Sequence, residues 1–204
     1  KMTHEDAAKK WLADNKSMII ETGDNKILLV NTDTDKASTI ETINDVAVHP
    51  SISKDSRWLY YSSDKNGDWQ IWRQLITGKS IPELITPKGG YNGKESYDGK
   101  ELIFTKYQDL GLWKMHLGSK QESLIIEGLP RRTQFKICED SLFFANKENN
   151  MKQVWQYFFD SKKKVLVFES PISEGMQFDV NQSCSKLLYS VWQGESDIML
   201  LKIK

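Results

Sequence analysis

The sequence has little of what most catalytic and metal sites need. Only two cysteines and three histidines occur among 204 residues, and His4, His49 and His116 show no metal-ligand spacing with cysteines or carboxylates. The sequence contains no Gly-x-Ser-x-Gly elbow, no phosphate-binding glycine loop and no His-Glu-x-x-His motif. We therefore expect a protein that is not an enzyme, with no cofactor and no metal site.

An excess of charge and a long apolar run are also lacking. The 28 basic and 28 acidic residues cancel, whereas a nucleic-acid-binding domain usually carries a basic face. The single run of three like charges, Lys162-Lys163-Lys164, is typical of a solvated turn. No run of about 18 apolar residues occurs, so we expect no membrane insertion of this segment and no direct binding of nucleic acid.

What the sequence does contain is a repeat of about 42 residues. Segments 70–73, 111–114 and 153–156 read Gln-Ile-Trp-Arg, Gly-Leu-Trp-Lys and Gln-Val-Trp-Gln, and their tryptophans are 41 and 42 residues apart. Leu28 and Met199 occupy the same position in weaker copies of the repeat. Leu28 lies 44 residues before Trp72, and Met199 lies 44 residues after Trp155. A repeat of about 40–45 residues built from short strands and turns is the signature of a propeller blade. We predict an all-β fold, a β-propeller of four-stranded antiparallel blades with about five repeats.

Turn residues separate the predicted strands inside each repeat. Asn66-Gly67 closes a hairpin between segments 57–63 and 69–75, because both residues tolerate a positive φ. Asp64-x-Asn66-x-Asp68 resembles the start of a calcium loop, but its place between two strands favours the hairpin. An immunoglobulin-like sandwich or a closed barrel would also give short strands and frequent turns. Neither of these folds predicts tryptophans at a fixed period.

The repeats are expected at 14–43, 44–87, 88–129, 130–172 and 173–204, within a single domain of 1–204. The first lacks an obvious innermost strand and the last stops near its third strand, so an incomplete ring and a fragment of a larger ring both stay open. Segment 3–13 is expected to be a short helix, because Thr3 and Asp6 form a capping-box pattern before an apolar face. An unclosed ring would expose a strand edge, which favours a homodimer.

Tryptophan and cysteine positions follow from this alignment. The repeat tryptophans are expected to fill the wedge between blades, and three others are open to a ligand or partner contact: Trp58, Trp69 and Trp192. Cys138 and Cys184 fall just before the second strands of neighbouring repeats. Equivalent positions in adjacent blades are usually too far apart to bridge, so two thiols are favoured over a disulfide. The cysteine content leaves the cellular compartment open.

One side-chain type recurs just before each innermost strand. Aligned repeats place amide side chains there, at Asn44, Asn92, Gln134 and Gln177. Innermost strands line the channel of a propeller, so these amides are candidates for a ring at its mouth, with local capping of the loop backbone as the alternative. Tyr91 and the basic pair Arg131-Arg132 complete a candidate site. We expect it to bind a protein partner or a small polar ligand.

Segment 62–72, Ser-Ser-Asp-Lys-Asn-Gly-Asp-Trp-Gln-Ile-Trp, resembles the strand–turn–strand signature of TolB-type propellers. Tyr97-Asp98-Gly99-Lys100 resembles the Pro-Asp-Gly-Lys turn of that family, and segment 54–57 is a looser copy. Segments 89–92 and 111–113 together resemble the C-terminal propellers of membrane-anchored winged-helix regulators of the ToxR/CadC type. This resemblance implies a periplasmic sensory or protein-interaction domain of a transcriptional regulator. The alternatives are a TolB-like periplasmic scaffold in envelope assembly and the propeller of a prolyl-oligopeptidase-like peptidase.

Overall fold

The computed structural model describes residues 9–44, 46–77, 80–171, 177–181, 183–192 and 196–202. Over these residues all regular secondary structure is β-strand, as predicted. The chain forms two compact units that divide between Arg132 and Thr133.

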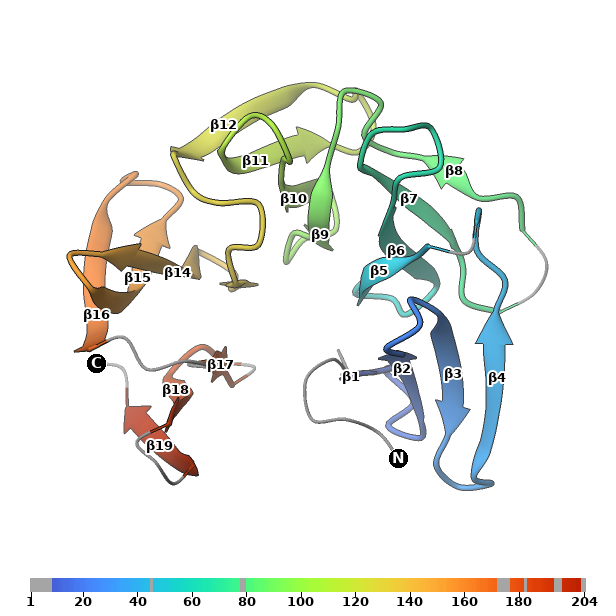
Figure 1. Cartoon of the computed structure of the whole chain (residues 1–204), viewed down its shortest axis with the longest axis horizontal. Coiled ribbons are helices and arrows are strands. Elements are labelled where there is room, and N and C mark those ends of the chain that lie inside the picture. Colours follow the sequence, from blue (N-terminus) through green and yellow to red (C-terminus); the bar gives the residue numbers. More distant parts are fainter. Residues whose placement is uncertain are drawn as a thin grey trace. The chain divides into compact units, whose positions relative to one another are not determined.

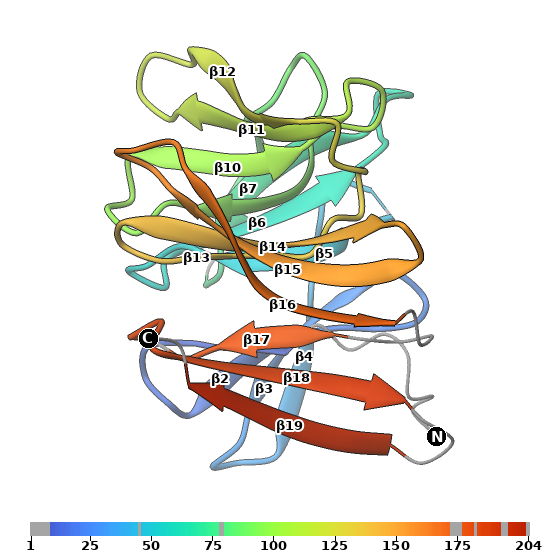
Figure 2. The ribbon, with the colours of Figure 1, turned by 90° about the vertical axis from the view of Figure 1, so that its left-hand side faces the viewer.

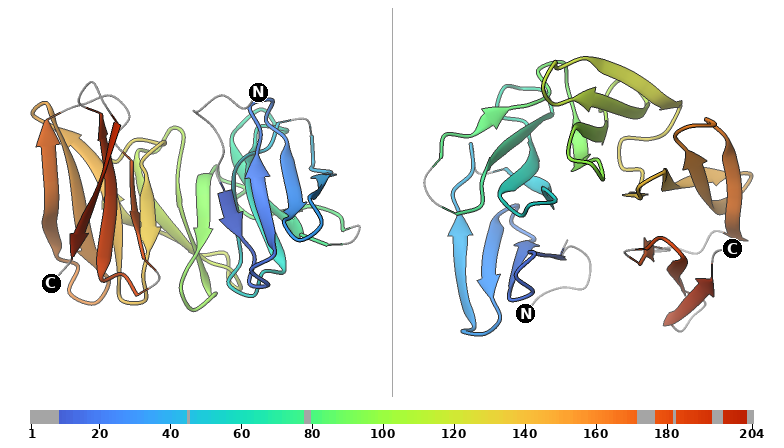
Figure 3. Two further views of the ribbon diagram at one scale, coloured as in Figure 1. Left: turned by 90° about the horizontal axis from the view of Figure 1, so that it is seen from below. Right: turned by 180° about the vertical axis from the view of Figure 1, so that it is seen from behind.

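Unit 1 contains three antiparallel four-stranded sheets, each with its strands in chain order. The first consists of β1 (Lys9–Trp11), β2 (Ser17–Glu21), β3 (Ile27–Asn31) and β4 (Lys36–Ile40). The second consists of β5 (Val48–Ile52), β6 (Trp58–Ser63), β7 (Gln70–Leu75) and β8 (Glu83–Leu84). The third consists of β9 (Tyr91–Glu95), β10 (Glu101–Thr105), β11 (Gly111–His116) and β12 (Glu122–Glu127). Within this unit β1, β5 and β9 lie on the inner side and β4, β8 and β12 on the outer side (Figure 1; Figure 3, right).

Unit 2 contains two further sheets (Figure 2). One consists of β13 (Phe135–Ile137), β14 (Ser141–Glu148), β15 (Met151–Phe158) and β16 (Lys164–Pro171). The other consists of β17 (Phe178–Val180), β18 (Lys186–Trp192) and β19 (Ser196–Lys202), three strands within the described residues. All pairings are antiparallel between consecutive strands. The predicted blade architecture is therefore confirmed in both units.

The tryptophan period has a packing origin. On the third strand of a sheet, each repeat tryptophan faces an aromatic residue of the second strand: Trp72 faces Tyr61, Trp113 faces Phe104 and Trp155 faces Phe144. Trp72 is 8% exposed and belongs to a core cluster that joins the first two sheets through Ile19 and Leu59. Trp113 packs against the core cluster shared by the second and third sheets. These two large side chains fill the wedge between diverging sheets, as the sequence predicts.

The turn chemistry also repeats. Ser53 Oγ donates to Asp55 Oδ1 over 2.6 Å, and Asp55 Oδ1 accepts from the N–H of Arg57 over 3.0 Å. In the next sheet Ser96 Oγ donates to Asp98 Oδ1 over 2.7 Å. These hydroxyl donors stabilise the ionised carboxyls and lower the pKa values of Asp55 and Asp98. One turn design therefore links the first and second strands of both sheets.

The N-terminal helix prediction is wrong for residues 9–11, and residues 3–8 lie outside the described part. Lys9–Trp11 form β1, which pairs antiparallel with β2 and is the innermost strand of the first sheet. The N–H of Leu12 donates to the carbonyl of Ser17 over 2.8 Å and closes this hairpin. Leu12 packs against the core cluster of the first two sheets. Pairing with β2 and packing against this core outweigh the local helical pattern.

The prediction of two free thiols is also wrong, because Cys138 and Cys184 form a disulfide within unit 2. Their Cα atoms lie 6.2 Å apart, a separation that a disulfide spans without backbone movement. Cys138 follows β13 and Cys184 precedes β18. Neighbouring sheets approach one another closely at their inner strands, since Gln134 Nε2 donates to the carbonyl of Phe178 over 2.5 Å beside the same strands. Equivalent loops of neighbouring blades are therefore close enough to bridge.

Candidate ligand-binding site

One end of the strands in unit 1 carries a connected group of rings and a guanidinium, which we call the aromatic cluster: His49, Trp69, Tyr91, Tyr107 and Arg131. His49 is the second residue of β5, Tyr91 opens β9, and Trp69 precedes β7. Tyr107 follows β10, and Arg131 lies in the segment after β12. These places are the beginnings of odd-numbered strands and the ends of even-numbered ones. Antiparallel order brings such places to one face of the unit.

The cluster is a continuous series of ring contacts. The His49 and Tyr91 rings meet edge to face with centroids 4.7 Å apart. Trp69 lies 5.1 Å from Tyr91 edge to face, and stacks on Tyr107 at 5.8 Å with an interplanar angle of 17°. The Arg131 guanidinium carbon lies 3.9 Å from the centre of the Tyr107 ring. Such aromatic and cation–π contacts hold each ring in a defined orientation.

Hydrogen bonds fix the histidine end of the cluster. His49 Nε2 and the Tyr91 hydroxyl lie 2.9 Å apart, and the N–H of His49 donates to Glu21 Oε2 over 2.9 Å. Burial, and secondarily the charges of Lys94 and Arg132, lower the pKa of His49 from 6.5 to about 4. Burial also raises the pKa of Tyr91. At neutral pH both side chains are uncharged hydrogen-bonding groups.

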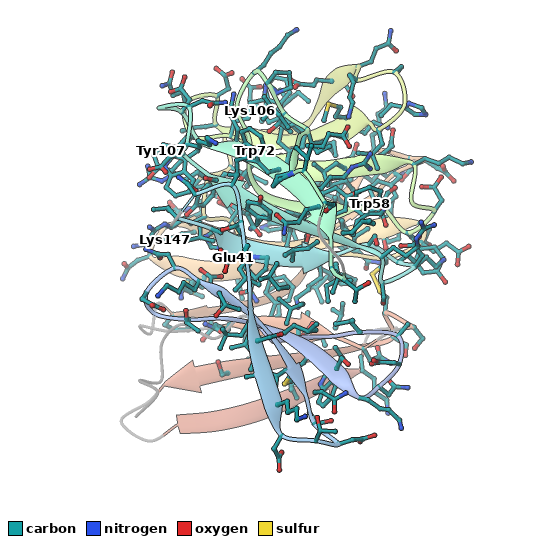
Figure 4. All side chains as sticks on the ribbon, turned by 90° about the vertical axis from the view of Figure 1, so that its right-hand side faces the viewer. Glu41, Trp58, Trp72, Lys106, Tyr107 and Lys147 are labelled. Atoms are coloured by element: carbon teal, nitrogen blue, oxygen red, sulfur yellow. A yellow bond between two sulfur atoms is a disulfide. The ribbon has the colours of Figure 1, made fainter. Side chains whose placement is uncertain are left out.

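A hollow lies on each side of the cluster. The first, of about 250 Å³, is lined by Trp69 and Tyr107 together with four charged side chains, Asp68, Lys88, Lys106 and Asp109. The second, of about 240 Å³, is lined by Glu21, Asn25, His49, Tyr91 and Arg132. Figure 4 shows Tyr107 at one rim of unit 1, whereas Trp58 lies toward the opposite side. Both hollows are mixed in character, with aromatic walls and charged edges.

A buried ion pair supports the wall of the first hollow. Lys106 Nζ lies 2.7 Å from Glu122 Oε2, and the two side chains are 6% and 11% exposed. The Lys106 ammonium also lies 4.2 Å from the centre of the Trp113 ring. Lys106 follows β10 and Glu122 is the first residue of β12, so the pair joins these two places. Lys106 also directly precedes Tyr107, a residue of the aromatic cluster.

The residues that the sequence predicted as a site fall into different surroundings. Tyr91, Arg131 and Arg132 come together at the cluster and its second hollow. Asn44 Oδ1 accepts from Ser63 Oγ over 2.6 Å and from the N–H of Val46 over 3.3 Å, which is a local capping arrangement.

The other three amides differ from Asn44. Asn92 is the second residue of β9, not a residue before it, and has φ of 50°. In unit 2 the Gln134 side chain bonds the backbone of Phe178, whereas Gln177 is exposed. A binding role for the four amides stays a prediction.

Sequence reasoning missed His49 and Tyr107 and left Trp69 open. One signal could have found His49, because it precedes Tyr91 by 42 residues, one full period. Ser51 Oγ likewise donates to the carbonyl of Gly93, 42 residues further on, over 2.6 Å. Inner-strand residues one period apart therefore contact each other. Of the other open tryptophans, Trp58 packs under the Arg73 guanidinium, and the Trp192 side chain lies outside the described residues.

The described residues hold no group of three or more His, Cys, Asp or Glu side chains placed to bind a metal ion. No helix long and apolar enough to cross a bilayer is found in the part of the chain that the structure describes.

Solved structures with a similar fold are numerous, whereas no family model matches the sequence. A protein assigned as TolB from Agrobacterium tumefaciens superposes with a TM-score of 0.81 and 16% identity, over 96% of this chain and 76% of that one. TolB from Acinetobacter baumannii superposes with a TM-score of 0.72 and 17% identity, over 87% of this chain and 46% of that one. The fold is that of a TolB-like β-propeller. The predicted fold class is thereby confirmed.

Other comparisons limit what this fold implies. An uncharacterized protein of Agrobacterium fabrum, Atu1656, is 37% identical over 60 residues, which are 28% of this chain and 20% of that protein. This chain therefore matches about a fifth of the length of that relative. An oligogalacturonate lyase in complex with manganese shares the propeller fold, with a TM-score of 0.63 and 10% identity. Propellers thus include enzymes, and a function has to be argued from the site. The resemblance to ToxR/CadC-type regulators stays a prediction.

Proposed function

We propose that this TolB-like propeller is a non-catalytic interaction domain that binds a segment of a protein partner on the face carrying the aromatic cluster. The observation that carries the proposal is the convergence of five side chains, from different strands and the segments that join them, between two hollows. Tryptophan, tyrosine and arginine are the residue types that dominate binding energy at protein interfaces. Their mutual contacts orient them before a partner arrives, which reduces the entropy lost on binding.

The surroundings of His49 support binding over catalysis. Its Nε2 contacts a tyrosine hydroxyl, and the nearby Glu21 carboxylate accepts from the backbone N–H of His49. A general base usually has a nucleophile on one ring nitrogen and an orienting carboxylate on the other. With a pKa of about 4, His49 is also a weak base at neutral pH.

The disulfide supports an extracytoplasmic setting. Disulfides persist in the periplasm and on cell surfaces, whereas cytosolic reductants keep most thiols reduced. The Cys138–Cys184 bond favours an extracytoplasmic domain, and the likeness to TolB structures favours a periplasmic interaction or scaffold domain over the regulator and the peptidase. A sensory propeller of a membrane-anchored regulator would have the same compartment, but no specific feature of this site favours it.

The test is a peptide-library selection on the purified chain. We expect the selected peptides to bind the Trp69→Ala and Tyr107→Ala variants at least about tenfold more weakly than the wild type, since aromatic side chains dominate the binding energy at such interfaces. Trp58→Ala is the matched control, because Trp58 is a half-buried tryptophan away from the cluster. Thermal unfolding of each variant checks that the fold is retained. Selected peptides that bind all three variants equally would contradict the proposal.

A further inference from the structure

Two consecutive arginines reach opposite sides of the aromatic cluster. The Arg131 guanidinium lies over the Tyr107 ring, and Trp69, which stacks on Tyr107, lines the first hollow. Arg132 lines the second hollow beside His49 and Tyr91. The pair therefore contacts two parts of the cluster, with Arg131 on Tyr107 and Arg132 beside His49 and Tyr91.

The backbone of Arg131 is held by a hydrogen bond, whereas its guanidinium keeps a donor without a partner in the described residues. Its carbonyl accepts from the Thr105 hydroxyl over 2.5 Å, and the same hydroxyl lies 3.0 Å from the carbonyl of Tyr91. Its Nε–H is buried and meets no acceptor within the described part of the chain. Buried donors without a partner are rare in folded proteins, so each calls for an explanation. A guanidinium stacked on a ring can still bind a carboxylate along its planar edge.

The charged groups around the two guanidiniums are of both signs. Among the described residues neither Arg131 nor Arg132 forms an ion pair. Glu21 accepts from the N–H of His49, and Lys106 is already paired with Glu122. The remaining charges at the first hollow are two carboxylates and one ammonium, Asp68, Asp109 and Lys88. Asp68 and Asp109 line the first hollow, whereas Arg132 lines the second. The second hollow contains one acidic residue, Glu21.

We propose that the partner segment is acidic and extended, and that its carboxylates pair with Arg131 and Arg132 on either side of the cluster. This inference rests on the proposed function and names the chemistry of the partner. An extended chain advances about 3.3 Å per residue, so side chains two residues apart stand about 7 Å apart on one face. The Tyr91 and Tyr107 rings between the arginines have centroids 5.4 Å apart. Carboxylates at alternate positions of the partner therefore face the same side of the chain, which allows both to reach this surface.

The test uses fluorescein-labelled synthetic peptides of about eight residues, long enough to cross the cluster in extended form. They carry two glutamates separated by one, three or five alanines, and matched peptides carry glutamine instead. We expect wild-type protein to bind the glutamate peptides, best at the shortest spacing, and to bind the glutamine peptides about tenfold more weakly or not at all. Added sodium chloride is expected to weaken glutamate binding, since the contacts are ionic.

Four variants separate recognition from folding. Arg131→Gln and Arg132→Gln are each expected to weaken glutamate binding by about tenfold, and Arg131→Lys to restore part of it because the charge remains without the planar fork. Lys162→Gln is the matched control, since it removes an equal charge from an exposed turn after β15. It is expected to leave binding unchanged. Thermal unfolding checks that all four proteins are folded.

The outcomes distinguish this inference from the proposed function. If glutamate and glutamine peptides bind equally while Trp69→Ala abolishes both, the face is a peptide site and the acidic inference is wrong. If succinate at the same concentration displaces the glutamate peptide completely, the arginines form a small-carboxylate site, and a protein segment is the wrong ligand. If no synthetic peptide binds and the library yields no cluster-dependent binder, both proposals fail.

Discussion

Loss of the Cys138–Cys184 disulfide is expected to destabilise unit 2 by about 4 kcal/mol. The bond closes a loop across a sequence separation of 46 residues. Cross-linking a loop of that length removes chain entropy from the unfolded state, which corresponds to about 4 kcal/mol at 25 °C. The two cysteines also join the core that connects the two sheets of this unit, beside Phe143 and Phe178. The bond therefore links the two blades at the core that they share.

The perturbation is the double substitution Cys138→Ala and Cys184→Ala, compared with wild-type protein reduced by a phosphine. The substitution removes the cross-link and two buried sulfur atoms, whereas reduction removes the cross-link alone. The assay is guanidinium chloride unfolding followed by circular dichroism, which reports the free energy of unfolding. Hydrogen exchange shows which part of the chain loses stability. We expect faster exchange in β13–β18 and unchanged exchange in β2–β10.

Two results would refute this reasoning. One is a loss below about 1 kcal/mol in both the double variant and the reduced wild type, because the entropic contribution of the loop would then be absent. The other is the titration of two free thiols in unreduced, denatured protein, which would show that the bond does not form. Equal acceleration of exchange in both units would show that the bond stabilises the whole chain and not unit 2 alone.

Three further predictions concern unit 1. Stability is expected to fall as the pH drops from 6.5 toward about 4, because His49 binds a proton in the unfolded chain but stays neutral in the folded one. Thermal unfolding of His49→Gln should lack this part of the pH dependence. Glu122→Gln is expected to cost about 3 kcal/mol in urea unfolding, since it leaves the buried Lys106 ammonium unpaired, and a cost near zero would contradict a buried pair. Gly93→Ala is expected to cost about 2 kcal/mol, because the new Cβ would lie 2.5 Å from an isoleucine methyl of β7. Gly23→Ala, which meets no atom within 4 Å, is the control and should unfold like the wild type.

The repeat could be predicted because its signals are local. Asn66-Gly67 and Asp98-Gly99 mark turns by their own backbone preferences, and Gly67 and Gly99 indeed have φ of 90° and 74°. The tryptophan period reports one position in successive copies of the same unit. The N-terminal strand could not be predicted in this way, because β1 has three residues and is defined by pairing with β2. Its residues alone resemble a helix.

By itself, the sequence determined the all-β class, the blade architecture and the recurring position of the tryptophans. Only the tertiary structure decided which residues of neighbouring blades touch. His49 meets Tyr91, and Cys138 bonds Cys184, because inner strands of adjacent sheets lie close together while outer strands diverge. The spacing between sheets depends on the size of every core side chain along both faces. A repeat period states which positions are equivalent, but the distance between them is set by packing.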